Sequence, residues 1–215
     1  MPAKSSAVAI YVIAFLGVLV SIYALSYYTG AQNFLPAKGS LVKELYWNIA
    51  FYIHITSGAI ALGVGWIQFI KKFRIKNIRR HRIIGKVYVA GIIFFASPSG
   101  MVLAFNANEG LAAQLGFGCL AFIWFYVTLK AWLAIKTGNV VHHRAWITRS
   151  YALTMAAITL RVWLPLAMAF NLSMHQAYPA ISWFCWVPNL LVTEWLILPH
   201  TIKHAKAVKP APAVL

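Results

Sequence analysis

Acidic residues are scarce in this sequence, which has three of them against 19 lysines and arginines in 215 residues. Only Glu194 falls inside a long apolar segment, so neither a catalytic triad nor a two-metal site can be assembled, and hydrolytic chemistry is disfavoured. Cysteine is scarce as well. Cys119 and Cys185 lack the spacing of a disulfide pair or a metal site, and we expect each to pack as a small apolar residue.

Apolar residues, by contrast, make up 61% of the chain, and its mean hydropathy is +0.72. Six segments reach the roughly 20 residues that a helix needs to cross a bilayer, near residues 8–28, 46–70, 83–105, 112–135, 150–171 and 179–199. We therefore predict an all-α polytopic membrane bundle of six transmembrane helices. It forms a single domain over residues 1–208, followed by a disordered tail over 209–215. The first segment has no clear cleavage site after it, so we expect a retained helix.

The basic residues predict the orientation of these helices, because short loops rich in lysine and arginine stay cytoplasmic. Such residues flank the second and fourth connections and follow the last span, whereas the other side has only Lys38 and Lys43. Both termini are thus expected in the cytoplasm and the protein in a bacterial inner membrane. The net charge of +16 then points to anionic lipid headgroups as partners. No nucleic-acid-binding module is recognisable, so nucleic acid is not an expected partner.

Polar residues at membrane depth form one predicted layer in the outer half of the bundle. His54 and Arg161 lie at similar depths, and Asn189 and the interrupted segment 97–99 fall near the same level. Ionisable residues inside a membrane usually mark function. We expect His54, Arg161 and Asn189 to hold a quinone carbonyl or a lipid headgroup.

A stripe of small residues accompanies His54 on the second span. Gly58, Ala61 and Gly65 follow it at helical spacing, so one helix face carries a histidine and a smooth groove. Such a groove admits a flat ligand. The alternative is that the small residues only let a neighbouring helix approach, as they commonly do in membranes.

A second predicted layer lies at the cytoplasmic boundary. His81 opens the third span, and His142, His143, Arg144 and Arg149 open the fifth. These residues could converge on a ligand, although basic residues at a membrane boundary also anchor helices to headgroups. Nearby, Glu194 must be paired or protonated, so it is a candidate for an ion pair or for proton relay.

Two motifs carry a resemblance to a known family. The sequences HRIIGKVY from His81 and HHRAWITRSYALT from His142 fit the patterns HRxxGKxY and HHRxWxxRSYALT. In these motifs the chain resembles a family of predicted bacterial multi-span membrane proteins that is classed as a domain of unknown function. The resemblance implies no activity. It places the following residues at pattern positions of the family: His54, His81, His143, Arg144, Trp146, Arg149, Ser150 and Arg161.

A weaker resemblance is to the ascorbate-reducible transmembrane cytochromes b, in which paired histidines hold haem near each membrane face. Here the fourth span has no histidine, which leaves His54 without an axial partner. His81 with His142 or His143 could hold a single haem b, with His81 and His143 as iron ligands. The propionate partners would be Arg144, Arg149, Arg82 and Lys86. If the protein is an enzyme, this resemblance implies a component of a membrane oxidoreductase.

The sequence therefore predicts a membrane protein of electron transfer, with haem b or a quinone as cofactor. Two other functions stay open. One is an accessory or assembly subunit of a larger membrane complex. The other is a small-molecule transporter, which the lack of a convincing repeat between the two halves disfavours.

Overall fold

The computed structural model describes residues 3–29 and 36–199 and is all-helical within them. Six helices are long and apolar enough to cross a membrane, which confirms the predicted fold class. They cover Val8–Tyr28, Leu45–Phe69, Ile78–Phe105, Leu111–Lys136, Val140–Ala169 and Met174–Ile197, numbered here as spans one to six. The tail predicted to be disordered, 209–215, lies outside the described residues.

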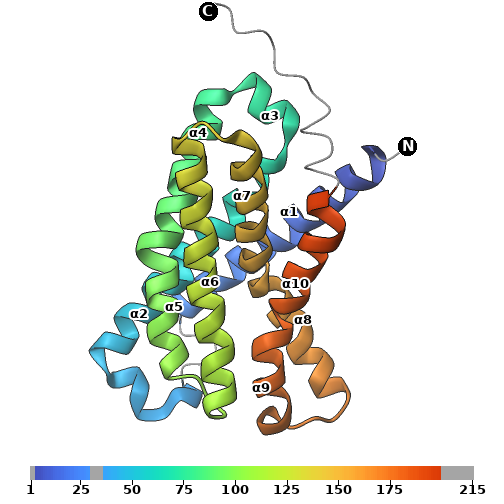
Figure 1. Ribbon diagram of the computed structural model, residues 1–215. Helices are drawn as coiled ribbons and strands as arrows, with labels where there is room; N and C mark the ends of the chain where they lie inside the picture. The colour runs from blue at the N-terminus through green and yellow to red at the C-terminus, as the bar shows by residue number, and fades with distance from the viewer. Residues whose placement is uncertain (1–2, 30–35, 200–215) are drawn as a thin grey trace, which may run out of the picture.

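Several spans consist of consecutive helical pieces (Figure 1). Spans one and two are α1 (Ala3–Leu25) with η1 (Ser26–Tyr28), and α2 (Leu45–Gly65) with η3 (Trp66–Phe69). Span three joins α4 (Ile78–Ala90), η4 (Gly91–Ala96) and α5 (Ser97–Phe105), whereas span four is the single helix α6 (Leu111–Lys136). Span five joins α7 (Val140–Thr154) and α8 (Ala156–Ala169), and span six joins α9 (Met174–Phe184), α10 (Val187–Val192) and η5 (Thr193–Ile197). Two short helices, η2 (Pro36–Lys43) and α3 (Lys71–Lys76), lie in the connections.

Prolines account for two of the interruptions. Pro98 follows η4, a π-helical turn, and the wider turn accommodates a residue that has no N–H to donate. Pro188 stands at the start of α10, where a missing N–H costs little. Two other prolines, Pro165 in α8 and Pro179 in α9, lie inside helices that continue through them.

Spans five and six begin earlier than the sequence predicted. Span five starts at Val140 because the Asn139 side chain caps its first turn, accepting a bond of 3.1 Å from the backbone N–H of His142. Span six starts at Met174 because Ser173 and Gln176 form a capping box. The predicted boundaries followed hydropathy and missed these polar first turns.

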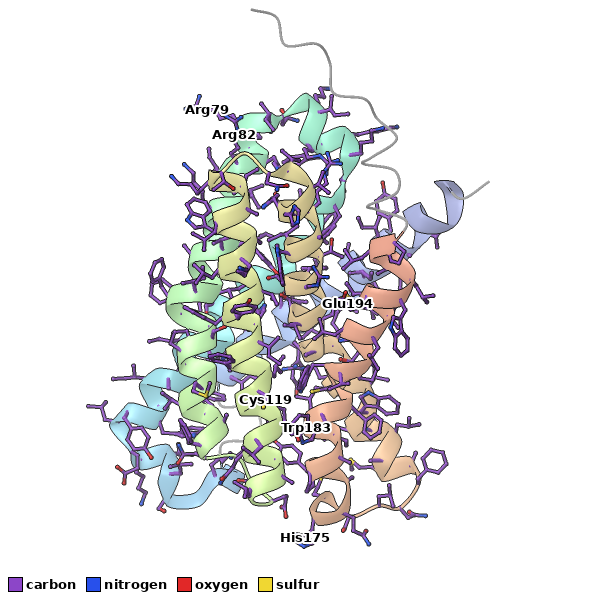
Figure 2. The ribbon with its side chains drawn as sticks, viewed as in Figure 1. Arg79, Arg82, Cys119, His175, Trp183 and Glu194 are labelled. Carbon is purple, nitrogen blue, oxygen red and sulfur yellow. The ribbon has the colours of Figure 1, made fainter. Side chains whose placement is uncertain are left out.

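The two ends of the bundle differ in charge. One end, here called the basic end, carries α3, the start of α4 and the turn between α6 and α7, and Arg79 and Arg82 project from it (Figure 2). The opposite end, here called the far end, carries η2 and the turns that precede α6 and α9, and His175 marks it (Figure 2). Behind the other spans, α1 runs obliquely between the two ends (Figure 1).

We expect the basic end to be cytoplasmic, on the asymmetry of lysine and arginine between the two ends. A reporter that works only in the cytoplasm should then be active when fused after Asn77. A reporter that works only outside the cytoplasm should be active when fused after Asn108. Paired alkaline phosphatase and fluorescent protein fusions in bacterial cells measure this. The opposite pattern at both sites would show that the basic end faces away from the cytoplasm.

Candidate functional site

A cavity of about 290 Å³ lies in the far half of the bundle. Counted along the helices, His54 lies about 13 Å from the far end of α2 and Arg161 about 12 Å from that of α8, and both line the cavity. The structure therefore brings together two of the three residues predicted for the outer layer. Six aromatic side chains contribute to its walls: Tyr27, Trp47, Phe51, Phe117, Trp124 and Tyr178.

His54 is held in one orientation by its neighbours on span three. Its Nδ1 lies 2.8 Å from the carbonyl oxygen of Ala96, which can only accept a hydrogen bond, so Nδ1 carries the proton. In the neutral ring Nε2 is then an acceptor. The ring packs against Gly100, where an added Cβ would lie 2.9 Å from the His54 ring carbon Cε1. The glycine is thus required for this close approach.

Arg161 carries a positive charge at the same cavity. Its Nη1 donates to the carbonyl oxygen of Ala157 at 2.8 Å, one turn earlier in α8. The guanidinium carbon lies 5.3 Å from the centre of the Tyr23 ring, within cation–π range. Tyr27, beside Tyr23 on span one, also interacts with Arg161. Two tyrosines of the first span therefore hold the guanidinium in place.

Lys38, from η2, adds a second cation to the cavity lining. Its ammonium donates to the carbonyl oxygen of Asn106 at 2.9 Å and to Oδ1 of Asn108 at 2.8 Å. Burial lowers the pKa of this ammonium below its ordinary value. None of the described residues that line the cavity is acidic, so its electrostatic character is positive.

Trp47 supplies a hydrogen-bond donor that the sequence analysis missed. The residue is 1% exposed and lines the cavity, and its Nε1 has no hydrogen-bond partner among the described residues. A buried indole N–H normally finds an acceptor. No pattern in the sequence distinguishes Trp47 from the eight other tryptophans.

A buried hydroxyl cluster, here defined as Tyr88, Thr128, Ser150 and Thr154, meets the cavity through Thr154. The Tyr88 hydroxyl lies 3.0 Å from that of Ser150 and 2.8 Å from that of Thr154, and the Ser150 hydroxyl lies 2.7 Å from that of Thr128. Trp124 donates its Nε1 to the Thr154 hydroxyl at 3.2 Å. Thr154 and Trp124 also line the cavity. The cluster therefore joins spans three, four and five beside the cavity.

The same cluster gives the two sequence motifs a physical meaning. Tyr88 is the last residue of HRxxGKxY, and Ser150 and Thr154 belong to HHRxWxxRSYALT. Their hydroxyls bond to one another although 62 and 66 residues separate Tyr88 from the other two. The motifs thus hold spans three and five together at mid-depth.

The stripe of small residues serves a different purpose at each end. A Cβ added at Gly58 would meet nothing within 4 Å, and Gly58 lines the cavity. A Cβ added at Gly65 would lie 2.5 Å from the Tyr151 ring and 2.9 Å from the Tyr88 ring. The groove interpretation therefore holds at Gly58, and the helix-packing interpretation holds at Gly65.

Asn189, the third residue predicted for the outer layer, is not among the residues that line the cavity. Its amide donates to the carbonyl oxygens of Ala152 and Cys185 at 3.2 and 3.1 Å, and to the Thr159 hydroxyl at 3.2 Å. It therefore ties span six to span five. Depth counted along the sequence could not give the direction of this side chain.

Glu194 pairs with Arg149 across spans five and six. The two groups form a bidentate pair in which Arg149 Nε donates to Oε1 and Nη2 donates to Oε2, the latter at 2.8 Å. The guanidinium carbon also lies 4.6 Å from the centre of the Trp146 ring. Glu194 sits toward the basic end of its span, well separated from His175 (Figure 2).

The histidines predicted at the basic end occupy three different environments. His142 is exposed and interacts with the side chain of Asn139 at 2.9 Å. His143 donates Nδ1 to the carbonyl oxygen of Ala131 at 2.8 Å, which leaves Nε2 as an acceptor. His81 lies within electrostatic range of His143, and its Nδ1 is buried without a partner among the described residues.

Comparison with known proteins gives one match. The model of the family described as predicted membrane protein (DUF2306) matches residues 51–197, which is more than half of the chain and contains both motifs. No curated protein and no solved structure matches.

The hydroxyl cluster should contribute measurably to stability. Replacing Tyr88 by Phe removes one hydroxyl from a buried network, and we expect a loss of about 1 kcal/mol in the free energy of unfolding. Denaturation of the purified protein in detergent, followed by tryptophan fluorescence, measures the change. Tyr11→Phe, on the exposed face of α1, is the matched control and should have no effect. Equal stability of the two variants would remove the energetic role assigned to the cluster.

Proposed function

The chain belongs to the DUF2306 family of predicted membrane proteins and is an integral multi-span membrane protein, and from this premise we propose that it binds a quinone in the far-half cavity. One observation carries the proposal. Aromatic side chains and two fixed cations surround a space of about 290 Å³ at membrane depth. We further propose that the membrane is the inner membrane of a bacterium.

The hydrogen-bonding groups of the cavity suit both redox forms of a quinone. Arg161 and the Trp47 indole N–H are donors, which a quinone carbonyl oxygen can accept. His54 Nε2 is an acceptor in the neutral ring, and a quinol hydroxyl can donate to it. Donors and an acceptor in one cavity thus complement a ligand that alternates between carbonyl and hydroxyl.

The walls of the cavity suit a flat ring. Aromatic pairs gain from offset or edge-to-face stacking, and the lining includes indole, phenyl and phenol rings. The volume is near the lower end of the roughly 300–1,000 Å³ typical of ligand sites. It therefore favours a single substituted ring, with any isoprenoid tail continuing into the surrounding lipid.

Binding of a short-chain ubiquinone to the purified protein tests this proposal. The indoles of Trp47 and Trp124 line the cavity, so quenching of tryptophan fluorescence should report binding. Arg161→Gln and His54→Phe each remove one polar partner and should weaken binding about tenfold. Arg79→Gln, at the basic end, should leave the affinity unchanged.

A steric variant distinguishes the effect of filling the cavity from general effects of a substitution on the bundle. Gly58→Leu fills space that no atom occupies within 4 Å of the added Cβ, so the protein should fold and lose quinone binding. Gly91→Leu is the matched control, because Gly91 has equal space and does not line the cavity. Binding that survives Gly58→Leu would exclude this cavity as the site. Absence of binding in the wild-type protein would favour the accessory-subunit or transporter functions.

A haem b at the basic end is the second candidate, favoured by the approach of His81 to His143. Neutral imidazoles ligate iron, and the bond from His143 Nδ1 to Ala131 is the kind of contact that orients a metal-binding histidine. Arg149 is already paired with Glu194, so Arg144 is the better placed of these two predicted propionate partners. The aromatic cavity in the far half does not border these histidines, which makes haem secondary to quinone.

A dithionite-reduced minus air-oxidised absorption spectrum tests the haem directly. Sharp α and Soret bands with stoichiometric iron would support it, and His81→Ala or His143→Ala should then abolish the bands while the protein stays in the membrane. A flat spectrum after expression with ample haem would exclude this cofactor.

A further inference from the structure

Two arginines and two histidines gather at the basic end. Arg74 lies on α3, His81 on α4, and His143 and Arg144 on α7, and all four are partly buried. Arg74 lies within electrostatic range of Arg144 and His81, and His143 within range of Arg144 and Arg74. When charged, each of these neighbours repels the others.

No side-chain carboxylate compensates this repulsion. The chain has three acidic residues, and all of them are placed elsewhere. Glu44 precedes α2 at the far end, Glu109 pairs there with His175, and Glu194 pairs with Arg149. Burial, together with the nearby Arg144 charge, lowers the pKa of Arg74 below its ordinary value.

Two buried nitrogen atoms accompany the arginines. The Gln68 amide nitrogen and His81 Nδ1 are buried and have no partner among the described residues. Gln68 lies beside Gly85, where an added Cβ would be 3.5 Å from its Oε1. Gly85 follows His81 by one helical turn, so Gln68, on η3, packs against the side of α4 that carries His81. Buried polar nitrogens normally have hydrogen-bond partners, and these two call for one.

We propose that Arg74, Arg144, His81 and Gln68 form a binding site for a phosphate group. Guanidinium forks match phosphate oxygens in pairs, and a Gln amide and an imidazole N–H supply further donors. An anionic group between the arginines converts their repulsion into attraction. The phosphate can belong to an anionic phospholipid headgroup or to a free phosphate, and basic pockets between spans at a cytoplasmic face commonly take lipid headgroups.

This site differs from the general positive charge of the same end. Arg79 and Arg80 also lie at the basic end but are exposed, and they can serve as a non-specific attraction for the membrane surface. Exposed and partly buried arginine pairs of equal charge therefore provide a matched comparison.

Lipid retention measured by native mass spectrometry tests the proposal on the full-length protein. Purified protein is incubated with phosphatidylglycerol, with phosphatidylcholine as the neutral control, and separately with inorganic phosphate. We expect one phosphatidylglycerol to be retained by the wild-type chain. The double variant Arg74→Gln with Arg144→Gln should retain about tenfold less, whereas Arg79→Gln with Arg80→Gln should stay within about twofold of wild type.

The outcomes distinguish the sources of the phosphate and the competing explanations. Retention of phosphatidylglycerol identifies a headgroup, and thermal stabilisation by inorganic phosphate alone identifies a free phosphate. Equal loss in the two double variants, or equal retention of phosphatidylcholine, would overturn the proposal in favour of non-specific attraction. Haem bands that vanish in the Arg74 and Arg144 variant would assign the cluster to propionates instead. If that variant does not fold, Arg144→Lys, which keeps the charge but loses the fork, should show the reduced retention.

Discussion

A bilayer offers no hydrogen-bonding partners, so each polar group at membrane depth must be satisfied inside the protein. The hydroxyl cluster of Tyr88, Thr128, Ser150 and Thr154 meets this constraint where spans three, four and five cross. Tyr88 is 1% exposed, and Ser150 and Thr128 are fully buried. In water such hydroxyls could bond to solvent instead. In lipid they bond to one another, and these bonds fix the relative position of three helices.

The position of the cluster separates two sites of different character. On its far side the bundle holds an aromatic cavity with His54 and Arg161, and on its other side the basic end gathers His81 and Arg144 around Arg74. Both sites are cationic, because the chain has only three acidic side chains and none of them belongs to either site. The scarcity of acidic residues thus leaves both places with a net positive charge.

The sequence predicted the fold well and the site in part. Hydropathy found all six spans, since lipid solvation imposes a length and an apolar composition that can be read directly. Depth along the helices placed His54 and Arg161 at the same level, and both line the cavity. Trp47 and Lys38 were missed. One is an ordinary aromatic residue by its sequence surroundings, and the other lies in a connection whose course no periodicity predicts.

What the sequence alone determined is the environment: the number of spans, the basic and far ends, the family motifs, and the depth of each ionisable residue. Tertiary structure decided the partners. It turned Asn189 toward span five and away from the cavity, left space at Gly58, and closed it with tyrosine rings at Gly65. Depth is a property of one helix and can be counted along the chain. The direction of a side chain depends on how helices are rotated against each other, and only their packing sets that rotation.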